Sequence, residues 1–389
     1  MLELLFATVF VLALLLLVHT YFLYPGLLYL VASALPQSEQ AEYNTLPSVA
    51  LVIAAYNEED VIADKIENSL ELSYPDDRLS ILVFSDASSD RTDEIVRSYK
   101  DAGVELIRIE GRVGKTECQN RVVDRIDEEI VVFSDANSMY EPDVITELVT
   151  AFEPNVGCVI GELKYHDSGN VDGESVYWKY ESIIKRLESA VHSAVTGNGS
   201  IYAVRRSSYV PLSREAISDF AEPLALVSNG KRVKYEPAAT AWENTGQTVE
   251  EELERRSRIV TRCWHTVASY AQLLNPVAYP VFSTQLFSHK VLRWLSPVLL
   301  GIIAVSNVAL LVVSSHPLYV GLFGLQAAFY LIAGVGFILD QHNVSAPSVI
   351  HIPYYFLMAN YGMLLGLWNF LSGRNIITWE TATRETQGK

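Results

Sequence analysis

The sequence predicts an α/β domain built on a mostly parallel sheet, with transmembrane helices on both sides of it. Between residues 48 and 135, short apolar runs alternate with segments of helix length, which is typical of βαβ units. Residues 2–35, 295–339 and 350–371 contain almost no charged side chains, and apolar stretches of about 20 residues are long enough to cross a bilayer. Residues 47–262 have the mixed composition of a soluble domain.

The net charge limits the class of partner. The 389-residue chain carries a formal charge of −17, which argues against a nucleic-acid partner and does not suit an anionic lipid surface. Such acidity is typical of a halophilic organism, where dissolved salt screens the self-repulsion. The three cysteines, Cys118, Cys158 and Cys263, lack metal-site spacing and indicate a reducing compartment without disulfides.

Four transmembrane helices are predicted. The first lies near Leu2–Tyr24, with Pro25 and Gly26 as a break or kink, and it lacks the basic region and cleavage site of a signal peptide. The others lie near Leu295–Val313, Leu318–Leu339 and His351–Phe370. The predicted organisation is an N-terminal transmembrane segment (1–35), the α/β domain (48–245), interfacial amphipathic helices (246–294), C-terminal transmembrane helices (295–371) and a tail (372–389).

The elements of the α/β domain follow from the apolar runs and the residues that bound them. Strands are predicted at Ser48–Ala55, Leu79–Phe84, Val104–Ile109 and Ile130–Phe133. The helices between them are predicted at Glu59–Leu72, Thr92–Tyr99 and Glu117–Ile126.

Acidic side chains stand at the ends of three of these strands: Glu58, Asp86 and Asp135. Because ligands bind at the carboxyl ends of strands in open α/β sheets, we expect these side chains to converge on one pocket. Asp135 and Asn137 offer the hard oxygen ligands that Mg²⁺ or Mn²⁺ accepts. The alternative is a polar strand-to-helix turn in which Asn137 or Ser138 caps the following helix.

Six motifs in order along the chain carry a family resemblance: AAYNEE, SDASSDRT, RVGKTECQN, FSDANS, TGNGSIYAVRR and SDFAEPL. Together they resemble the inverting family-two glycosyltransferases of the GT-A fold, over residues 48–245. The flanking apolar helices resemble those of membrane-bound members related to cellulose, hyaluronan and poly-N-acetylglucosamine synthases. The resemblance implies a Rossmann-like GT-A catalytic domain that uses a nucleotide sugar.

The resemblance assigns the nucleotide-sugar site by position. Ala55 and Glu58 match the first nucleotide contacts, and Glu58 suits the ribose hydroxyls. Asp86 matches the position that reads the base, and Lys115 the one whose ammonium approaches the nucleotide. Asp135 matches the first carboxylate of the metal motif, which would hold Mg²⁺ or Mn²⁺ against the diphosphate.

Asn137 departs from the family pattern. The usual metal motif has a second carboxylate at this position, whereas Asn137 offers an amide oxygen without charge. We therefore expect a metal held more weakly, or with more help from the substrate phosphates.

The resemblance places the catalytic base in the segment AISDFAEPLAL, where Asp219 is our choice and Glu222 the second candidate. A base is needed to take the proton from the acceptor hydroxyl as it attacks the anomeric carbon. The alternative is that Asp219 merely caps the helix Phe220–Asn229.

Acceptor contacts are expected between the metal motif and the base. Gly197 and Gly199 permit close backbone approach, and Trp178 could stack on a sugar ring, although core packing is the competing interpretation. Arg258 keeps the arginine of the family's Gln-x-x-Arg-Trp motif, and a guanidinium suits a diphosphate. Arg255 and Ile259 stand where the Gln and Trp would be, which puts processive synthesis in doubt.

The basic residues Lys290 and Arg293 precede an apolar span, which predicts a cytoplasmic α/β domain on a multi-pass membrane protein. Arg374, Arg384 and Lys389 in the tail conflict with this topology if three spans follow the domain.

The expected activity is an inverting, metal-dependent transfer of sugar from a nucleotide-diphosphate sugar, UDP-linked by expectation. The acceptor would be a growing polysaccharide or a lipid-linked glycan, joined through a β-linkage. One alternative is transfer to a polyprenyl phosphate, and others are a membrane-anchored nucleotide-sugar-binding protein without turnover, or a transporter. The expected partners are therefore a nucleotide sugar, a glycan or lipid-linked acceptor and membrane lipids, with no nucleic acid.

Overall fold

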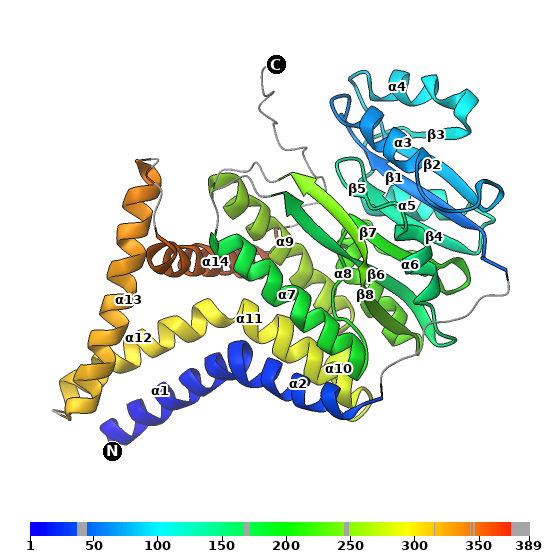
Figure 1. Cartoon of the computed structure of the whole chain (residues 1–389). Helices are drawn as coiled ribbons and strands as arrows, with labels where there is room; N and C mark the ends of the chain where they lie inside the picture. Colours follow the sequence, from blue (N-terminus) through cyan, green and yellow to red (C-terminus); the bar gives the residue numbers. More distant parts are fainter. Residues whose placement is uncertain are drawn as a thin grey trace.

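The computed structural model describes residues 1–36, 45–166, 172–244, 249–314, 316–342, 344 and 347–374. The predicted tail lies outside the described residues from position 375 onward. A mixed sheet with its helices forms one side of the molecule and long apolar helices form the other (Figure 1). Between them lie α7 (Asp172–Val191), α9 (Val249–Ser269) and α14 (Ser348–Leu371).

The sheet has eight strands in the order β3-β2-β1-β4-β7-β6-β8-β5. The first four, which are parallel, are β1 (Val49–Ala55), β2 (Leu79–Asp86), β3 (Val104–Ile109) and β4 (Ile130–Asp135). Beyond β4, β7 (Ile201–Arg205) is antiparallel to both β4 and β6 (Val156–His166), while β8 (Arg232–Asn244) is parallel to β6. The short β5 (Met139–Tyr140) pairs antiparallel with β8. The prediction of a mostly parallel α/β sheet is confirmed.

The helices of the α/β domain cover both faces of the sheet. They are α3 (Ile62–Leu70), α4 (Thr92–Ser98), α5 (Lys115–Val123), α6 (Val144–Thr150) and α8 (Ser218–Ser228), with short 3₁₀ turns at Asp76–Arg78, Lys100–Ala102 and Arg206–Ser208. Alternate residues of β1 enter two different cores. Val52 and Ala54 share one with α5, α8 and α9, and Ile53 and Ala55 share the other with α3 and α6. A strand buried on both faces explains the unbroken apolar run.

Helix α3 is shorter than predicted at both ends. The prediction began it at Glu59, but Glu59 belongs to a turn that is tied to the neighbouring loop. Its backbone N–H donates to Asp90 and its carboxylate accepts from the backbone N–H of Arg91. These local hydrogen bonds offer the backbone an alternative to the helix, which therefore begins at Ile62.

The N-terminal apolar segment is one continuous helical stretch, not a helix broken at Pro25. It consists of α1 (Leu2–Val18), a π-helical turn (His19–Leu23) and α2 (Tyr24–Ala34), with Pro25 in the first turn of α2. A proline cannot donate to the preceding turn and its ring crowds the carbonyl four residues back. The wider π turn just before Pro25 accommodates this, so the stretch is kinked rather than broken there: α1 and α2 run in different directions in Figure 1.

A second π-helical turn faces the first. After a 3₁₀ turn at Ala271–Leu274, the chain runs through α10 (Pro280–Leu286), a π turn (Phe287–Val291) and α11 (Leu292–Trp294). His19 Nε2 lies 3.0 Å from the Ser288 hydroxyl, which joins the two π turns. Beneath them, the buried Glu188 of α7 accepts a 2.6 Å hydrogen bond from Tyr24 Oη and lies 2.8 Å from His289 Nδ1. The first helix is thus attached to the domain through buried polar contacts.

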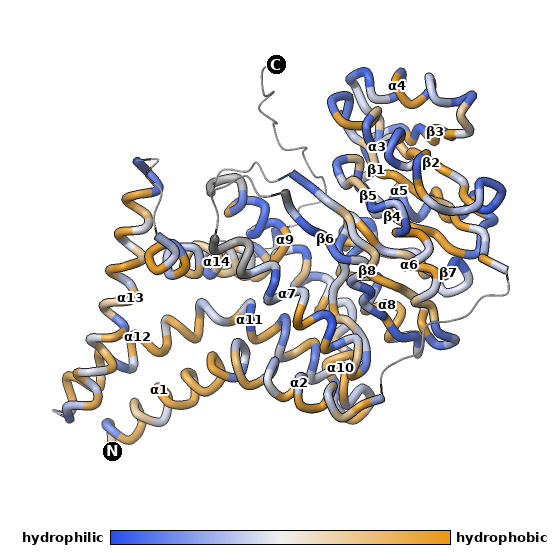
Figure 2. Tube along the Cα trace, viewed as in Figure 1, coloured by the Kyte–Doolittle hydropathy of each residue, from blue (hydrophilic) through white to orange (hydrophobic). Residues whose placement is uncertain are grey.

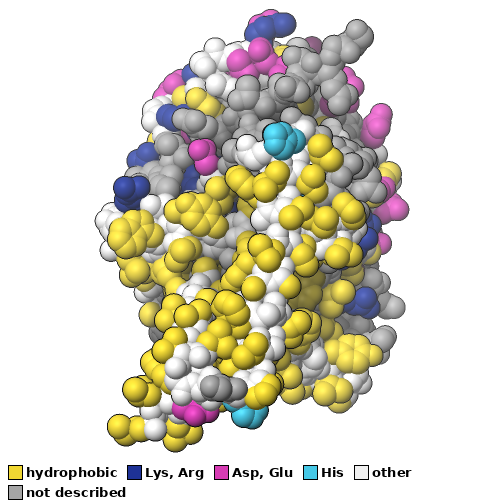
Figure 3. Space-filling view, turned by 90° about the vertical axis from the view of Figure 1, so that its left-hand side faces the viewer, with side chains coloured by type: hydrophobic (Ala, Val, Ile, Leu, Met, Phe, Trp, Pro, Cys, Tyr) yellow, Lys and Arg dark blue, Asp and Glu magenta, His cyan; other side chains and the backbone are white. Residues whose placement is uncertain are grey.

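Three helical segments of the described chain are long and apolar enough to cross a membrane: Leu2–Ala34, α12 (Ser296–Val313) and α13 (Pro317–Gln341). They carry the continuous hydrophobic colouring in Figure 2, and hydrophobic side chains cover much of the face seen in Figure 3.

The fourth predicted span, near His351–Phe370, forms a helix but is not among these three. It is α14, which packs along α9. A Cβ on Gly366 would lie 2.7 Å from Val260 Cβ, so the glycine lets the two helices approach closely. Buried residues along α14 include Tyr354, Asn360 and Met363. One side of α14 therefore packs against α9.

Candidate active site

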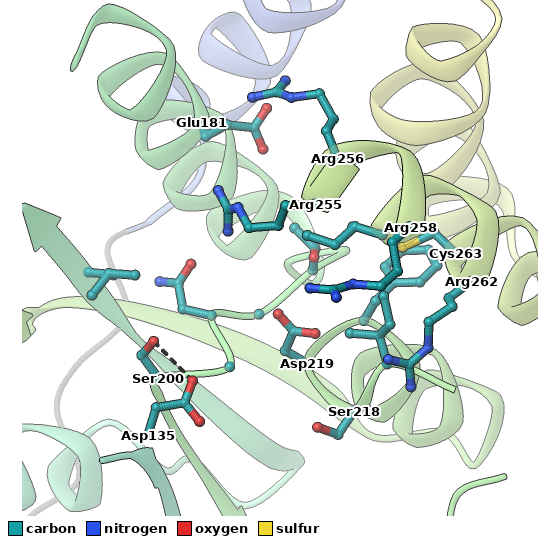
Figure 4. Close-up of a pocket in the computed structure, with 18 of the residues that line it drawn as sticks. Asp135, Glu181, Ser200, Ser218, Asp219, Arg255, Arg256, Arg258, Arg262 and Cys263 are labelled. Atoms are coloured by element: carbon teal, nitrogen blue, oxygen red, sulfur yellow. Dashed lines mark hydrogen bonds between the residues drawn. The ribbon is translucent and has the colours of Figure 1, made fainter. Parts of the chain in front are cut away.

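A cavity of about 500 Å³ opens at the carboxyl ends of β1 and β4. Its walls come from these strand ends, the loop 196–200, the start of α8 and the facing sides of α7 and α9. Asp135 and Asp219 lie on one side of the pocket, and arginines of α9 extend over it (Figure 4). The predicted site residues that line it are Glu58, Lys115, Asp135, Asn137, Trp178, Gly197, Gly199, Asp219 and Arg258.

The carboxylate of Asp135 has two neighbours. One oxygen accepts a hydrogen bond from Lys115 Nζ, which also donates to the backbone carbonyl of Gly199 over 3.2 Å. The other oxygen lies 3.5 Å from the Ser200 hydroxyl, as drawn in Figure 4. Lys115 is the first residue of α5 and follows Gly114, whose φ of 95° turns the chain into the pocket. Two sequence-predicted residues thus meet as an ion pair.

Glu243 is a site residue that the sequence analysis missed. It lies near the end of β8, lines the cavity, and accepts hydrogen bonds from the hydroxyls of Ser138 and Ser200. Burial, and then the negative charge of Asp135, raise the pKa of this carboxyl above its usual value. No motif marks Glu243, since only the pairing of β8 with β5 brings it beside the FSDANS segment.

The residues beside Asp135 fit a divalent cation. Asp135, Asn137 and Glu243 line the same cavity and provide two carboxylates and an amide oxygen, the donors that Mg²⁺ and Mn²⁺ prefer. Within the part of the chain that the structure describes, no three His, Cys, Asp or Glu side chains are grouped as a metal site. A cation here would therefore complete its coordination with water and with the phosphates of a substrate.

Asp219 is the second residue of α8 and faces the cavity. The residue before the helix is Ile217, and Asp219 makes no capping hydrogen bond, so the interpretation as a helix cap was wrong. Burial raises the pKa of Asp219 above its usual value, while the positive charges of Lys115 and Lys185 lower it. A partly desolvated carboxylate beside the metal motif is suited to act as a general base.

Glu222, the second candidate for the base, lies one turn further along α8 and is fully buried. It is not part of the cavity lining, and neither carboxyl oxygen has a hydrogen-bond partner among the described residues. Burial raises the pKa of Glu222 to about 8. The structure therefore separates the two acidic residues of SDFAEPL, with Asp219 in the pocket and Glu222 in the core.

We expect Glu222→Gln to stabilise the protein increasingly as the pH rises. Between the ordinary glutamate pKa of about 4.3 and the folded-state pKa of about 8, the folded chain holds a proton that the unfolded chain releases. Raising the pH over this range therefore favours unfolding of the unchanged protein, and the glutamine variant cannot titrate. Thermal unfolding near pH 5 and pH 8 gives the free energy of unfolding of both proteins. The advantage of the glutamine variant should grow to more than about 1 kcal/mol at the higher pH. An equal difference at the two pH values would contradict this.

Gly197 and Gly199 bring the backbone close to Asp219 and Lys115. The backbone N–H of Gly197 donates to the carbonyl of Asp219 over 2.7 Å, and a Cβ at this position would lie 2.8 Å from that oxygen. A Cβ on Gly199 would lie 3.4 Å from Lys115 Nζ and 3.6 Å from Asp219 Oδ2. The close approach predicted for both glycines is present, and it positions Asp219.

Gly197→Ala should disturb catalysis more than Gly199→Ala. The Gly197 Cβ would overlap backbone that cannot move independently of α8, whereas the Gly199 Cβ meets the end of a flexible lysine. We expect at least a tenfold loss of turnover for Gly197→Ala, comparable to the cost of a displacement of about 1 Å at an active site. Initial rates at saturating donor would test this. Equal rates for the two variants would show that the Gly197 contact does not hold Asp219.

Of the residues predicted to contact the nucleoside, Glu58 lines the cavity, whereas Ala55 and Asp86 do not. Glu58 lines the cavity, but Ala55 is fully buried on the α3 side of β1, and its neighbours Ala54 and Tyr56 line the cavity instead. Asp86 is also fully buried and outside the lining. Its carboxylate accepts hydrogen bonds from Arg112 and from the backbone N–H groups of Val113 and Gly114 at 2.7–2.9 Å. Asp86 therefore orders the loop that leads to Lys115.

Arginines of α9 form the opposite wall. Arg258 points toward Asp219 in Figure 4. Arg262 donates to the backbone carbonyls of Glu215 and Ala216, just before α8, and Arg255 pairs with Glu252 on its own helix. Trp178 of α7 is half-buried in the cavity wall, with its ring 5.3 Å from that of Tyr165. Trp178 therefore lines the cavity while its ring also packs against Tyr165.

The sheet with this site at its strand ends has the GT-A fold. A solved structure, the mannosyltransferase PcManGT from Pyrobaculum calidifontis in complex with GDP-Man and Mn²⁺, superposes with a TM-score of 0.72. The similarity covers 94% of this chain and 100% of that one at 19% sequence identity, which supports the fold.

Residues 50–210 match the family described as Glycosyl transferase family 2. The chain is 25% identical over 214 residues to poly-β-1,6-N-acetyl-D-glucosamine synthase of Staphylococcus aureus (strain MSSA476), covering 52% of each chain. The protein of the same name from Staphylococcus epidermidis is 24% identical over 220 residues, which cover 54% of this chain and 53% of that one. The similarity spans about half the length of these curated relatives.

Proposed function

We propose that the protein is a membrane-anchored, inverting glycosyltransferase that takes sugar from a nucleotide-diphosphate sugar, with UDP-sugars as the expected donors. The sugar passes to a growing polysaccharide or a lipid-linked glycan and forms a β-linkage. One observation carries this proposal: the Asp219 carboxylate shares a pocket with the Asp135–Lys115 pair at the strand ends of a GT-A domain.

The proposed reaction is a single displacement. Asp219 accepts the proton of the acceptor hydroxyl, the hydroxyl oxygen attacks the anomeric carbon, and the nucleotide diphosphate leaves from the opposite face. Attack opposite the leaving group inverts the configuration, so an α-linked donor gives a β-linked product. Lys115 and Arg258 line the same cavity and would stabilise the charge on the leaving diphosphate.

A divalent cation, Mg²⁺ or Mn²⁺, would be held by Asp135, Asn137 and Glu243. It would supply Lewis-acid stabilisation of the leaving diphosphate. At the nucleoside end, we propose that Glu58 binds the ribose and that Ala55 contributes through its backbone. Asp86 contributes to base binding through the loop that it orders.

Acceptor contacts are proposed for Gly197, Gly199 and Trp178, which lie on the Asp219 side of the cavity and on α7. The catalytic domain is proposed to face the cytoplasm, where nucleotide sugars are made. Lys290 and Arg293, just before the apolar α12, support that orientation.

The test is release of nucleoside diphosphate from a panel of UDP- and GDP-sugars. Full-length protein in detergent is assayed with Mn²⁺ or Mg²⁺ and with EDTA, at high salt. We expect cation-dependent release from one donor, and the product linkage is then read by NMR. Tight UDP binding without release from any donor would instead support the binding-protein alternative. A retained α-configuration in the product would contradict inversion.

A further inference from the structure

One charged side chain lies on the buried face of α3. Ile62 and Ile66 of this helix belong to the core beside β1, and Lys65, which shares their face, is 0% exposed. An ammonium group at this depth loses its hydration, which is costly unless other groups replace the water. The groups that replace the water therefore indicate what Lys65 does.

Lys65 holds the loop that follows β4. Its ammonium donates a hydrogen bond to the backbone carbonyl of Ser138 and lies over the ring of Tyr140, 3.6 Å from the ring centroid. Further along α3, the side-chain amide of Asn68 donates to the carbonyl of Tyr140 over 2.9 Å and accepts from its backbone N–H over 2.8 Å. One helix therefore fixes the backbone of this loop at two positions, Ser138 and Tyr140.

Ser138 connects this anchor with the proposed cation site. Its backbone N–H donates to the carbonyl of Asp135 over 3.3 Å, and its hydroxyl donates to the carboxylate of Glu243. The third proposed ligand, Asn137, is its neighbour in the chain. Each of the three ligands is thus bonded to Ser138 or directly precedes it. A shift of the Ser138 carbonyl would therefore change the spacing of all three.

The charge of Lys65 also acts on the cation site. Burial lowers the pKa of Lys65 to about 7, and the negative charges of Asp135 and Glu243 oppose this shift. Since like charges repel, an ammonium group that interacts with both carboxylates would repel a cation bound between them. The charge of Lys65 therefore weakens cation binding, whereas its hydrogen bond to the loop favours it. The two effects have opposite signs, so an experiment can separate them.

We propose that Lys65 is a positioning residue for the cation site. Its hydrogen bond to Ser138 sets the arrangement of the three proposed ligands, although Lys65 itself does not touch the cation. The inference rests on the proposed glycosyltransferase function and specifies how the ligands of that site are held. Groups that orient the ligands of a metal from behind typically contribute a factor of about 10–100 to its affinity. This role explains a lysine on a helix face that otherwise packs against the sheet.

Binding of Mn²⁺ to the full-length protein in detergent tests the proposal directly. Electron paramagnetic resonance measures the free Mn²⁺ during a titration in the presence of UDP. Lys65→Met removes the ammonium and leaves an apolar side chain of similar size, and we expect the Kd of Mn²⁺ to rise about tenfold or more. An unchanged Kd would show that Lys65 serves only the core. A lower Kd would show that only its charge acts on the site, and either result would overturn the proposal.

Ser69→Ala is the matched control. Ser69 is also buried on α3, and its hydroxyl donates to the backbone carbonyl of Lys65 over 2.7 Å, within the helix. This variant should leave the Kd of Mn²⁺ unchanged. If Lys65→Met does not fold, Lys65→Gln takes its place, because its amide ends one bond short of the ammonium position. The same rise in the Kd is expected, and an unchanged Kd would overturn the proposal in the same way.

Donor turnover at increasing Mn²⁺ concentration separates positioning from a general structural defect. A high concentration should restore most of the turnover of Lys65→Met, because its three ligands are intact, and turnover that stays low would overturn the proposal. If the unchanged protein binds no Mn²⁺ with UDP present, the cation site is contradicted and the inference loses its basis. Mn²⁺ binding that depends on Lys65, without turnover of any donor, would contradict the proposed function and still support the positioning role.

Discussion

Asp219→Asn should lower the turnover number by about 10²–10⁴, the range that a positioned general base contributes. The amide keeps the size of the side chain but cannot accept the acceptor's proton. Donor binding should persist, because the ion pair of Asp135 with Lys115 does not involve Asp219. Initial rates at saturating donor and acceptor, with UDP or GDP affinity by calorimetry, separate the two effects. A variant that retains a tenth of the activity would remove Asp219 from the role of base.

The matched control for that experiment is Glu222→Gln, three residues further along α8 and outside the cavity lining. It should keep normal turnover. The pH profile adds an independent check: burial raises the pKa of Asp219, and the base must be ionised. Activity should therefore fall on the acid side at a higher pH than the ordinary aspartate value of about 4. An acid limb at or below that value would contradict a desolvated base.

Asp135→Ala should abolish cation-dependent turnover, with a loss of at least about 10²-fold. The variant removes the carboxylate that faces both Lys115 and Ser200 and leaves a weaker donor set, Asn137 and Glu243. Binding of Mn²⁺ can be followed directly by electron paramagnetic resonance, with and without UDP. EDTA should reproduce the loss in the unchanged protein. Full activity in EDTA would show that the transfer needs no divalent cation.

Asn137→Asp is the informative partner of that variant. The added carboxylate should lower the Mn²⁺ concentration that gives half-maximal activity, because the amide of Asn137 contributes no charge to the cation. If Asn137→Asp leaves this concentration unchanged, Asn137 does not lie in the coordination sphere.

The sheet and the position of the pocket could be predicted because the relevant signals are local. Each predicted strand is an apolar run bounded by polar residues; Asp135 is the last residue of β4, and Glu58 lies three residues after the end of β1. Parallel pairing then brings the strand ends to one edge. The far half of the sheet was not foreseen in detail, because β6, β7 and β8 pair across long separations and with mixed direction.

The site residues that the sequence analysis missed or misplaced also depend on contacts between distant parts of the chain. Whether a side chain at a strand end points into the pocket or beneath it depends on the register and on the loop that follows. Asp86 was expected to read a base, but it is fully buried and accepts hydrogen bonds from its own loop. Glu243 reaches the cavity because β8 pairs with β6 and with β5, contacts between residues about 80 and 100 positions apart.

The junction between the first helix and the domain bears on the modularity of the protein. Glu188 is buried and contacts Tyr24 near one end of the chain and His289 far along it, and the hydroxyl of Tyr180 donates to the backbone carbonyl of Tyr21. Removing the first helix would take one hydrogen-bond donor from a buried carboxylate and uncover one side of α7. The helix is therefore a structural part of the protein rather than a detachable tether. A shortened, soluble form would have to replace these contacts before its catalytic rates represented those of the whole chain.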